Sequence, residues 1–122
     1  MNRGDVFLVS PFYFPDRGHA GHFDEERSKE KFVVVLITDE PLAPEPDTVV
    51  LVASTLRAER APEFHEVFIP PTPQGFAALT AVDCSLPYTV PRGWIGTDLR
   101  FRLREEVMHE INVRLSVMLQ LR

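Results

Sequence analysis

The sequence of 122 residues predicts a mainly β protein, a small antiparallel β-barrel followed by a C-terminal α-helix. Two patterns indicate this class. Short runs rich in β-branched and aromatic residues recur up to residue 83 and are separated by segments rich in proline and glycine, which are typical of turns. Beyond residue 98 the apolar residues change to helical spacing. No helical pattern lies between the strands, so βαβ units are not expected.

The first strand is predicted at residues 5–10, where Gly4 and Pro11 bound a run rich in β-branched and aromatic residues. An irregular segment with several aromatic, glycine and acidic residues follows at positions 11–30. Loops of this length in a small domain usually serve a function or are partly disordered. The segment therefore separates the first strand from the second.

Four further strands are predicted at 32–37, 48–53, 64–69 and 79–83. The run at 32–37 is apolar on both faces of any strand drawn through it, which is typical of a central strand buried on both sides. The segment 39–47 contains too many prolines for a helix or an interior strand, so the chain turns there. These strands complete the predicted barrel.

The last element is predicted to be an amphipathic helix that begins between Asp98 and Arg104. Its apolar stripe consists of Leu103, Val107, Ile111, Leu115 and Met118. Further apolar residues lie off this stripe, at Val113, Val117 and Leu121. A barrel of this size buries limited apolar surface, so these extra residues predict a homodimer.

Net charge, cysteine content and the length of the apolar runs limit the function and the location that we expect for this protein. A net charge of −5 argues against a protein that coats nucleic acid through a broad basic surface, although a local basic patch remains possible. Cys84 is the only cysteine, so an intrachain disulfide is impossible and the residue is expected to be a small buried hydrophobe. There is no apolar run long enough to span a bilayer and no signal-peptide core. We expect a single cytoplasmic domain over residues 1–122, with no membrane association.

Five segments in order resemble the MazF/PemK toxins of type II toxin-antitoxin systems. They are Arg3-Gly4-Asp5 leading into a strand, Lys31 leading into a Val-rich strand, 49–55 ending in a hydroxyl pair, the strand 64–69, and the glycine-then-helix ending 96–121. The resemblance implies a Src-homology-3-like barrel, shared with the CcdB toxins. It also implies a homodimeric, metal-independent and sequence-specific endoribonuclease that needs no cofactor, cleaves single-stranded RNA, and is neutralised by a cognate antitoxin.

The resemblance also implies the catalytic residues. The family usually has Arg-Pro where this chain has Lys31-Phe32, so Lys31 takes the place of the catalytic arginine. Thr55, with Ser54 beside it, occupies the hydroxyl pair at the end of the third strand. RNA cleavage needs charge stabilisation on the phosphate, which a cation and a hydroxyl donor can supply. The ordinary alternative is that these are solvated strand-end side chains.

Basic residues near these positions are candidates for RNA binding through the phosphate backbone. They are Lys29, Arg3, Arg17, Arg57 and Arg60. Aromatic side chains offer possible stacking surfaces for unpaired bases, although such residues more often belong to a core or a dimer contact. These are Tyr13, Phe14, Phe23 and Trp94.

Histidines provide the remaining candidate chemistry. The spacing of His19 and His22, with Asp24 close by, suits two zinc ligands, but a third and a fourth are not evident, so no metal site is predicted. His65 could act as a general acid or base at neutral pH, and strand alternation does not settle which face it occupies.

Two other functions are compatible with the same barrel. One is a binding module that is catalytically inactive or directed at gyrase, as in CcdB. The other is a structural domain without toxic activity. Fold alone does not choose among these functions.

Overall fold

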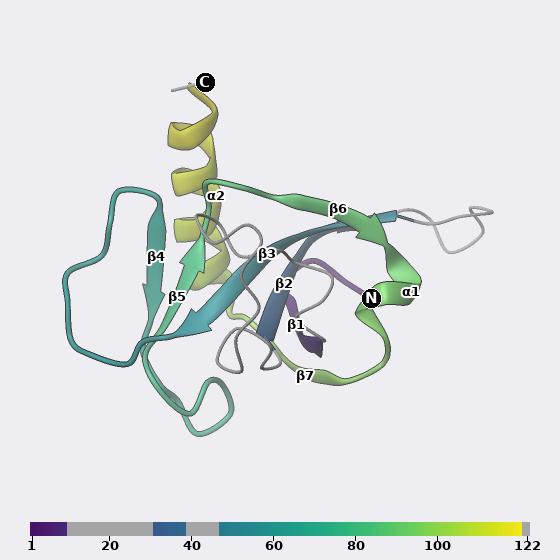
Figure 1. Cartoon of the computed structure of the whole chain (residues 1–122), viewed down its shortest axis with the longest axis horizontal. Helices are drawn as coiled ribbons and strands as arrows, with labels where there is room; N and C mark the ends of the chain where they lie inside the picture. The colour runs from purple at the N-terminus through teal and green to yellow at the C-terminus, as the bar shows by residue number, and fades with distance from the viewer. Residues whose placement is uncertain (10–30, 39–46, 121–122) are drawn as a thin grey trace, which may run out of the picture.

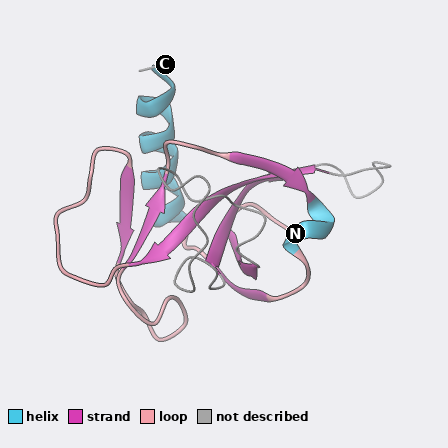
Figure 2. Cartoon of the chain, viewed as in Figure 1, coloured by secondary structure: helices cyan, strands magenta, loops and turns pink. Residues whose placement is uncertain are grey.

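The computed structural model describes residues 1–9, 31–38 and 47–120. Within these residues the chain forms β1 (Asp5–Val9), β2 (Lys31–Thr38), β3 (Asp47–Thr55), β4 (Glu66–Ile69), β5 (Thr80–Asp83), β6 (Tyr88–Pro91), α1 (Arg92–Ile95), β7 (Leu99–Arg102) and α2 (Glu105–Gln120). Figures 1 and 2 show a curled sheet with α2 standing beside its β4 and β5 side. The predicted class, antiparallel strands followed by a C-terminal helix, is confirmed.

The sheet has the strand order β4-β5-β3-β2-β1-β7, and β6 pairs with the outer part of β3. Every neighbouring pair is antiparallel. Since β4 and β7 lie at the two ends of this path, they are the edges of the curled sheet. The strand β2 therefore lies near the middle, as its apolar sequence predicts.

Apolar side chains on the two faces of the sheet form two clusters. The α2-side cluster joins the sheet to the last helix and includes Val34, Leu51, Ala53, Met108 and Ile111. The α1-side cluster includes Phe7, Val33, Val35, Val50 and Ile95. Consecutive residues of β2 enter different clusters because side chains alternate across a strand. This explains why β2 is apolar on both faces.

The last helix begins one residue after the range predicted for its start, because a strand precedes it. Residues 99–102 form β7, which pairs with β1, and α2 begins only at Glu105. Pairing with a strand some 95 positions earlier in the chain, as between Asp5 and Arg102, is invisible to local periodicity. The predicted apolar stripe is otherwise confirmed, with Ile111 fully buried, and Met108 adds a buried residue that was not predicted.

Three smaller features differ from the sequence prediction. The strand β4 begins at Glu66 and not at residue 64, because the Glu66 amide donates to the Glu63 carbonyl in a turn. The strand β6 and the single-turn helix α1 were not predicted, since elements of four residues carry little periodicity.

Cys84 is buried, and burial raises the pKa of its thiol to about 12. The thiol therefore stays protonated at neutral pH and behaves as a small core hydrophobe, as predicted. Among the described residues, neither α1 nor α2 combines the length and the hydropathy needed to cross a bilayer.

Candidate active site

The Arg3-Gly4-Asp5 segment forms a tight turn that joins three parts of the fold. Gly4 has a φ of +88°, a conformation that residues with a Cβ rarely adopt. Its amide donates to the Val35 carbonyl at 2.8 Å, and its own carbonyl accepts from the Leu103 amide at 2.9 Å. The glycine of this segment is therefore required by backbone geometry.

The charged residues of the same turn are used in internal bonds. The buried Asp5 carboxylate accepts from the Arg102 side chain at 2.8 Å and from the Asn2 amide at 2.8 Å. The Arg3 guanidinium donates to the Leu36 carbonyl at 2.9 Å and also to the Asn112 side chain. The side chains of this opening segment therefore connect β2, β7 and α2.

This placement separates Arg3 from the candidate catalytic residues. Leu36 lies five positions along β2 from Lys31, which corresponds to about 17 Å of extended strand. Arg3 therefore does not share a rim with Lys31, although it was predicted to be one of the RNA-binding residues near the catalytic positions. Arg17 and Lys29 lie outside the described residues.

The start of β2 and the end of β3 bring two of the predicted catalytic residues together. Phe32 pairs with Ala53, so continuation of the antiparallel register sets Lys31 opposite Ser54. Thr55 is the last residue of β3 and pairs with Thr80 of β5. The structure thus places the hydroxyl pair and the lysine at the same end of the sheet.

Strand alternation separates the two hydroxyls onto different faces. Lys31 and Ser54 lie two residues from Val33 and Val52, whose side chains belong to the α1-side cluster. Thr55 is one residue further along β3, so its side chain lies on the opposite, α2-side face. Only Ser54 of the pair therefore shares a face with Lys31.

Among the described residues, no partner engages the polar groups of these three side chains. Ser54 and Thr55 are exposed and Lys31 is half-buried. Within the described part of the chain, no hydrogen bond or ion pair engages the Lys31 ammonium or either hydroxyl. A cation and a hydroxyl that face the same way without internal partners can both donate to one phosphate group.

Of the remaining predicted RNA-binding residues, Arg60 forms an ion pair within the chain. Its guanidinium makes two bonds to the Glu66 carboxylate, at 2.6 and 2.7 Å, and lies 5.2 Å from the centre of the Phe68 ring. The bond between the two side chains raises the pKa of Arg60 and lowers the pKa of Glu66. Arg57 is exposed and follows two residues after Thr55, and it also has an interaction within the chain.

The structure places His65 in a carboxylate cluster away from this edge. His65 and two neighbours, Glu63 and Glu66, hold ligand atoms within 4.8 Å of one another. The Glu66 carboxylate already accepts from the Arg60 side chain and from the Glu63 amide, so a metal ion would compete with the guanidinium. The cluster therefore serves first to anchor the turn before β4.

Of the remaining candidate stacking and zinc-binding residues, the structure describes Trp94 alone. Trp94 lies on α1 and is 45% exposed, on an element that packs against β1 and β6 rather than at the Lys31 edge. The possible stacking residues Tyr13, Phe14 and Phe23 and the zinc candidates His19, His22 and Asp24 lie outside the described residues. Sequence reasoning did not single out Phe76, Phe101 or Arg104, which line a cavity described below.

Comparison with known proteins connects this geometry to a family. A sequence model of the PemK-like, MazF-like toxins of type II toxin-antitoxin systems matches residues 2–119. No curated protein matches the chain in sequence. Among solved structures, one described as an endoribonuclease in complex with its cognate antitoxin, from a mycobacterial species, has a TM-score of 0.65 at 18% identity, over 100% of this chain and 97% of that chain. This structural likeness shows a shared fold. Because the family match spans nearly the whole sequence, the chain belongs to the PemK-like, MazF-like toxin family of type II toxin-antitoxin systems.

Proposed function

We propose that this toxin is an endoribonuclease that cleaves single-stranded RNA at the edge formed by Lys31 and Ser54. The family and the description of the similar mycobacterial structure as an endoribonuclease support the activity. The observation that carries the assignment to this edge is the shared face of Lys31 and Ser54, whose polar groups have no partners within the described residues.

The proposed reaction is an internal phosphoryl transfer. The 2′-hydroxyl of one nucleotide loses its proton, and its oxygen forms a bond to the adjacent phosphorus. The bond from phosphorus to the 5′-oxygen breaks, and the leaving 5′-oxygen takes up a proton. Negative charge grows on the phosphate oxygens at the transition state. The Lys31 ammonium and the Ser54 hydroxyl donate to those oxygens, and Thr55 on the other face does not.

The proposed chemistry uses no metal ion. The role that a metal would have, stabilising charge on the phosphoryl oxygens, belongs here to the Lys31 ammonium. A chelator should therefore leave the cleavage rate unchanged. Loss of cleavage with chelator, restored by magnesium or zinc, would contradict this part of the proposal and direct attention to Glu63, His65 and Glu66.

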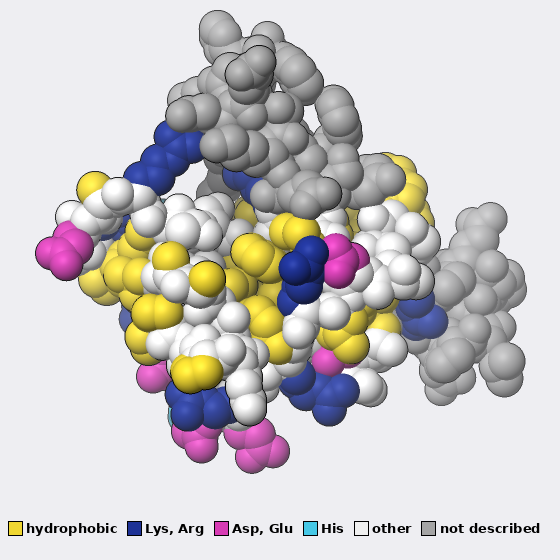
Figure 3. Space-filling model, turned by 90° about the horizontal axis from the view of Figure 1, so that it is seen from below, with side chains coloured by type: hydrophobic (Ala, Val, Ile, Leu, Met, Phe, Trp, Pro, Cys, Tyr) yellow, Lys and Arg dark blue, Asp and Glu magenta, His cyan; other side chains and the backbone are white. Residues whose placement is uncertain are grey.

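Contacts to the RNA backbone are proposed to be local. Figure 3 shows Lys and Arg side chains in separate places over the face seen from below, several of them beside Asp or Glu. A net charge of −5 fits this arrangement, since no broad basic surface is required. We assign backbone binding to Arg57 and Arg60, together with Lys29 and Arg17 from the segment that precedes β2 in sequence. Sequence specificity would come from base contacts beside these cations.

The homodimer and the antitoxin complete the proposal. Val113 and Leu119 on α2 are 50% and 64% exposed, more than bulky apolar residues usually are. A second copy that covers this face would remove them from water. Light scattering at micromolar concentration should report a dimer, and the double variant Val113→Asp, Leu119→Asp should be monomeric. A monomeric wild type would contradict the dimer.

The experiment that tests the activity is a cleavage assay on purified protein with a long single-stranded RNA. Fragments are expected, and their amounts should fall on addition of the cognate antitoxin. Absence of cleavage together with inhibition of gyrase supercoiling would replace this proposal with a gyrase-directed toxin. Absence of both activities would indicate a protein that has lost catalysis.

A further inference from the structure

The face of the sheet that carries Lys31 and Ser54 continues across β5 onto β4. Ser54 pairs with Ala81 of β5, and Ala81 pairs in turn with Phe68 of β4. These three residues are therefore neighbours in one row across three strands. Because adjacent strands lie about 4.8 Å apart, Phe68 lies roughly 10 Å from Ser54 along this row. The row leads from the proposed site of cleavage to an edge strand of the sheet.

The α2-side cluster shows that this row lies on one face. Four of its members are the sequence neighbours of the row on β3, β4 and β5, namely Ala53, Val67, Ile69 and Val82. Side chains alternate along a strand, so Ser54, Ala81 and Phe68 point to the opposite face. Lys31 lies on that opposite face as well, since its neighbour Phe32 packs against the α2-side cluster. Phe68 therefore shares a face with both proposed catalytic side chains.

An arginine from the segment before β4 lies over Phe68. The guanidinium carbon of Arg60 is 5.2 Å from the centre of the Phe68 ring. Its two terminal nitrogens donate to the Glu66 carboxylate at 2.6 and 2.7 Å, and one of them also donates to the Ala61 carbonyl at 3.2 Å. The same carboxylate accepts from the Glu63 amide at 2.9 Å. These bonds fix the plane of the guanidinium before any ligand binds.

The exposed part of this guanidinium is suited to stacking. The terminal nitrogens are used by Glu66, and the Phe68 ring lies against the group, but the Arg60 side chain is still 40% exposed. A planar group that is bonded along its edge and supported by a ring keeps a flat surface toward solvent. Unpaired nucleobases stack on arginine planes as well as on aromatic rings.

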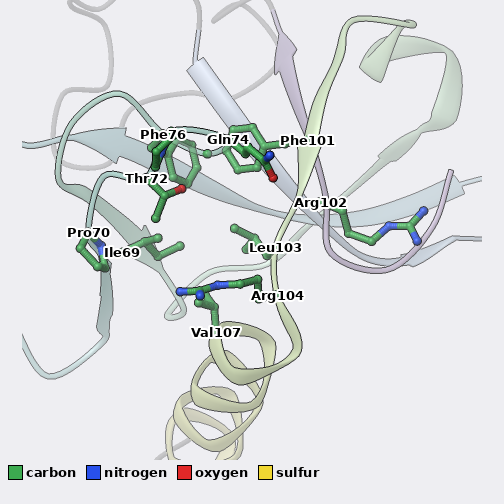
Figure 4. Close-up of a pocket in the computed structure, with 12 residues that line it drawn as sticks. Ile69, Pro70, Thr72, Gln74, Phe76, Phe101, Arg102, Leu103, Arg104 and Val107 are labelled. Carbon is green, nitrogen blue, oxygen red and sulfur yellow. The ribbon is translucent and has the colours of Figure 1, made fainter.

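The aromatic Phe76, which is also close to β4, offers no such surface. It lines a cavity of about 430 Å³ between the loop that joins β4 to β5 and the segment that leads from β7 into α2 (Figure 4). Phe76 is only 3% exposed, and the rings of Phe32 and Phe101 meet it edge to face, at 5.1 and 4.8 Å between centroids. It belongs to the α2-side cluster, on the face opposite to Ser54. A base is therefore expected to stack at Arg60 and not in this cavity.

We infer that Arg60, supported by Phe68 and held by Glu66, is a stacking platform for a nucleobase beside the scissile phosphate. The inference rests on the proposed cleavage at Lys31 and Ser54, and it adds a base-binding role to the backbone contact assigned to Arg60. The separation along the row is one that a nucleotide and its neighbour span. Stacking favours the larger purine rings, so a purine is expected at this position.

The test measures binding of short 2′-O-methyl oligonucleotides, which lack the attacking hydroxyl and so are not cleaved. Fluorescence polarisation compares oligoadenylate, oligouridylate and an abasic chain, all of equal length and charge. Arg60→Lys keeps the positive charge and removes the plane. We expect this variant to bind oligoadenylate at least about fivefold more weakly than wild type and the abasic chain within about twofold of wild type, with oligouridylate between them. Urea unfolding checks that the variant is folded.

The matched control is Arg100→Lys. Arg100 is also a partly exposed arginine paired with a carboxylate, that of Asp98, and it lies on β7 at the other end of the strand order. This variant should bind all three chains within about twofold of wild type. If Arg60→Lys weakens oligoadenylate and the abasic chain equally, Arg60 contacts phosphate alone and the inference is overturned. Equal losses in the Arg60 and Arg100 variants would overturn it too.

A second readout separates this platform from the proposed activity. The ends of the fragments cut from a long RNA are sequenced for wild type and for Arg60→Lys. Cleavage should continue, because Lys31 and Ser54 are unchanged, while the purine preference at one position beside the cut becomes weaker. If the wild type cleaves no RNA but Arg60→Lys loses base-dependent binding, the proposed function fails and the platform remains supported. If the wild type cleaves RNA and Arg60→Lys keeps both its cut sites and its oligoadenylate binding, the platform fails and the proposed function remains.

Discussion

The two ends of the central strand β2 are built in opposite ways. Near the Leu36 end, the turn of Arg3, Gly4 and Asp5 bonds to the strand, to β7 and to α2. At the Lys31 end, the ammonium and the Ser54 hydroxyl have no partner within the described residues. Groups that hold a fold together satisfy one another, whereas groups that bind a substrate must have bonding capacity left over.

This difference shows why a family resemblance does not by itself locate the chemistry. The Arg-Gly-Asp opening is one of the five segments that carry the resemblance, and it includes the cation Arg3. In the structure this cation donates to internal acceptors, Leu36 and Asn112. Lys31 instead shares a face with the Ser54 hydroxyl, and neither group has a partner within the described residues.

The largest effect on RNA cleavage is expected at the Lys31 end of β2. Lys31→Ala and Ser54→Ala should each lower RNA cleavage by about 100-fold or more, roughly 3 kcal/mol of barrier, because each removes a donor to the developing charge on the phosphate. The free energy of unfolding should change by less than about 0.5 kcal/mol, since neither side chain has a polar partner within the described residues. Cleavage kinetics and urea unfolding of both variants measure the two quantities.

Full cleavage by both alanine variants would contradict the assignment of this edge. In that event the search would move to His65 and Arg57, the other described candidates for a proton-transfer group and a phosphate-binding cation.

At the Leu36 end of β2, substitutions are expected to lower stability and to leave cleavage unchanged. Asp5→Ala should lower the free energy of unfolding by about 2 kcal/mol, because it removes bonds that a buried carboxylate accepts from Arg102 and from the Asn2 amide. Cleavage per folded molecule should not change. Urea unfolding gives the first quantity, and cleavage at a temperature well below the unfolding transition gives the second. A loss of cleavage in fully folded protein would show that the two ends are not separate.

Exchanging lysine and arginine at the two ends sharpens the comparison. Lys31→Arg should preserve or raise cleavage, because the planar guanidinium can hold two phosphate oxygens at once, and it should leave stability unchanged. Arg3→Lys should lower stability by about 1 kcal/mol, since one ammonium cannot reproduce the bonds to Leu36 and Asn112 together. The same two assays apply. A fall in cleavage with Lys31→Arg would mean that Lys31 does not hold the phosphate.

The smallest effect is expected at Thr55. Because its side chain lies on the face opposite to Lys31 and Ser54, Thr55→Ala should change cleavage by less than about threefold, well under 1 kcal/mol of barrier. Comparison with Ser54→Ala under identical conditions isolates the effect of the face, since both variants remove a hydroxyl from the end of β3. A larger loss at Thr55 than at Ser54 would show that the phosphate binds on the α2-side face.

Several features of the molecule could be predicted from local sequence. The apolar run of β2 predicted a strand buried on both faces, and the stripe through Ile111 predicted the last helix. The lone Cys84 was correctly expected in the core. These features depend on periodicity and polarity within short windows, which is the information that a sequence carries directly.

The arrangement of the site was decided by tertiary structure. Strand alternation alone puts the adjacent Ser54 and Thr55 on different faces, but the register between β2 and β3 decides which of the two shares a face with Lys31. The hydrogen bond from the Arg3 side chain to the Asn112 side chain joins residues 109 positions apart. The pairing of β7 with β1 also joins distant segments, as between Asp5 and Arg102, and it sets the start of α2 at Glu105. Such contacts depend on how distant segments meet, so neither propensity nor spacing contains them.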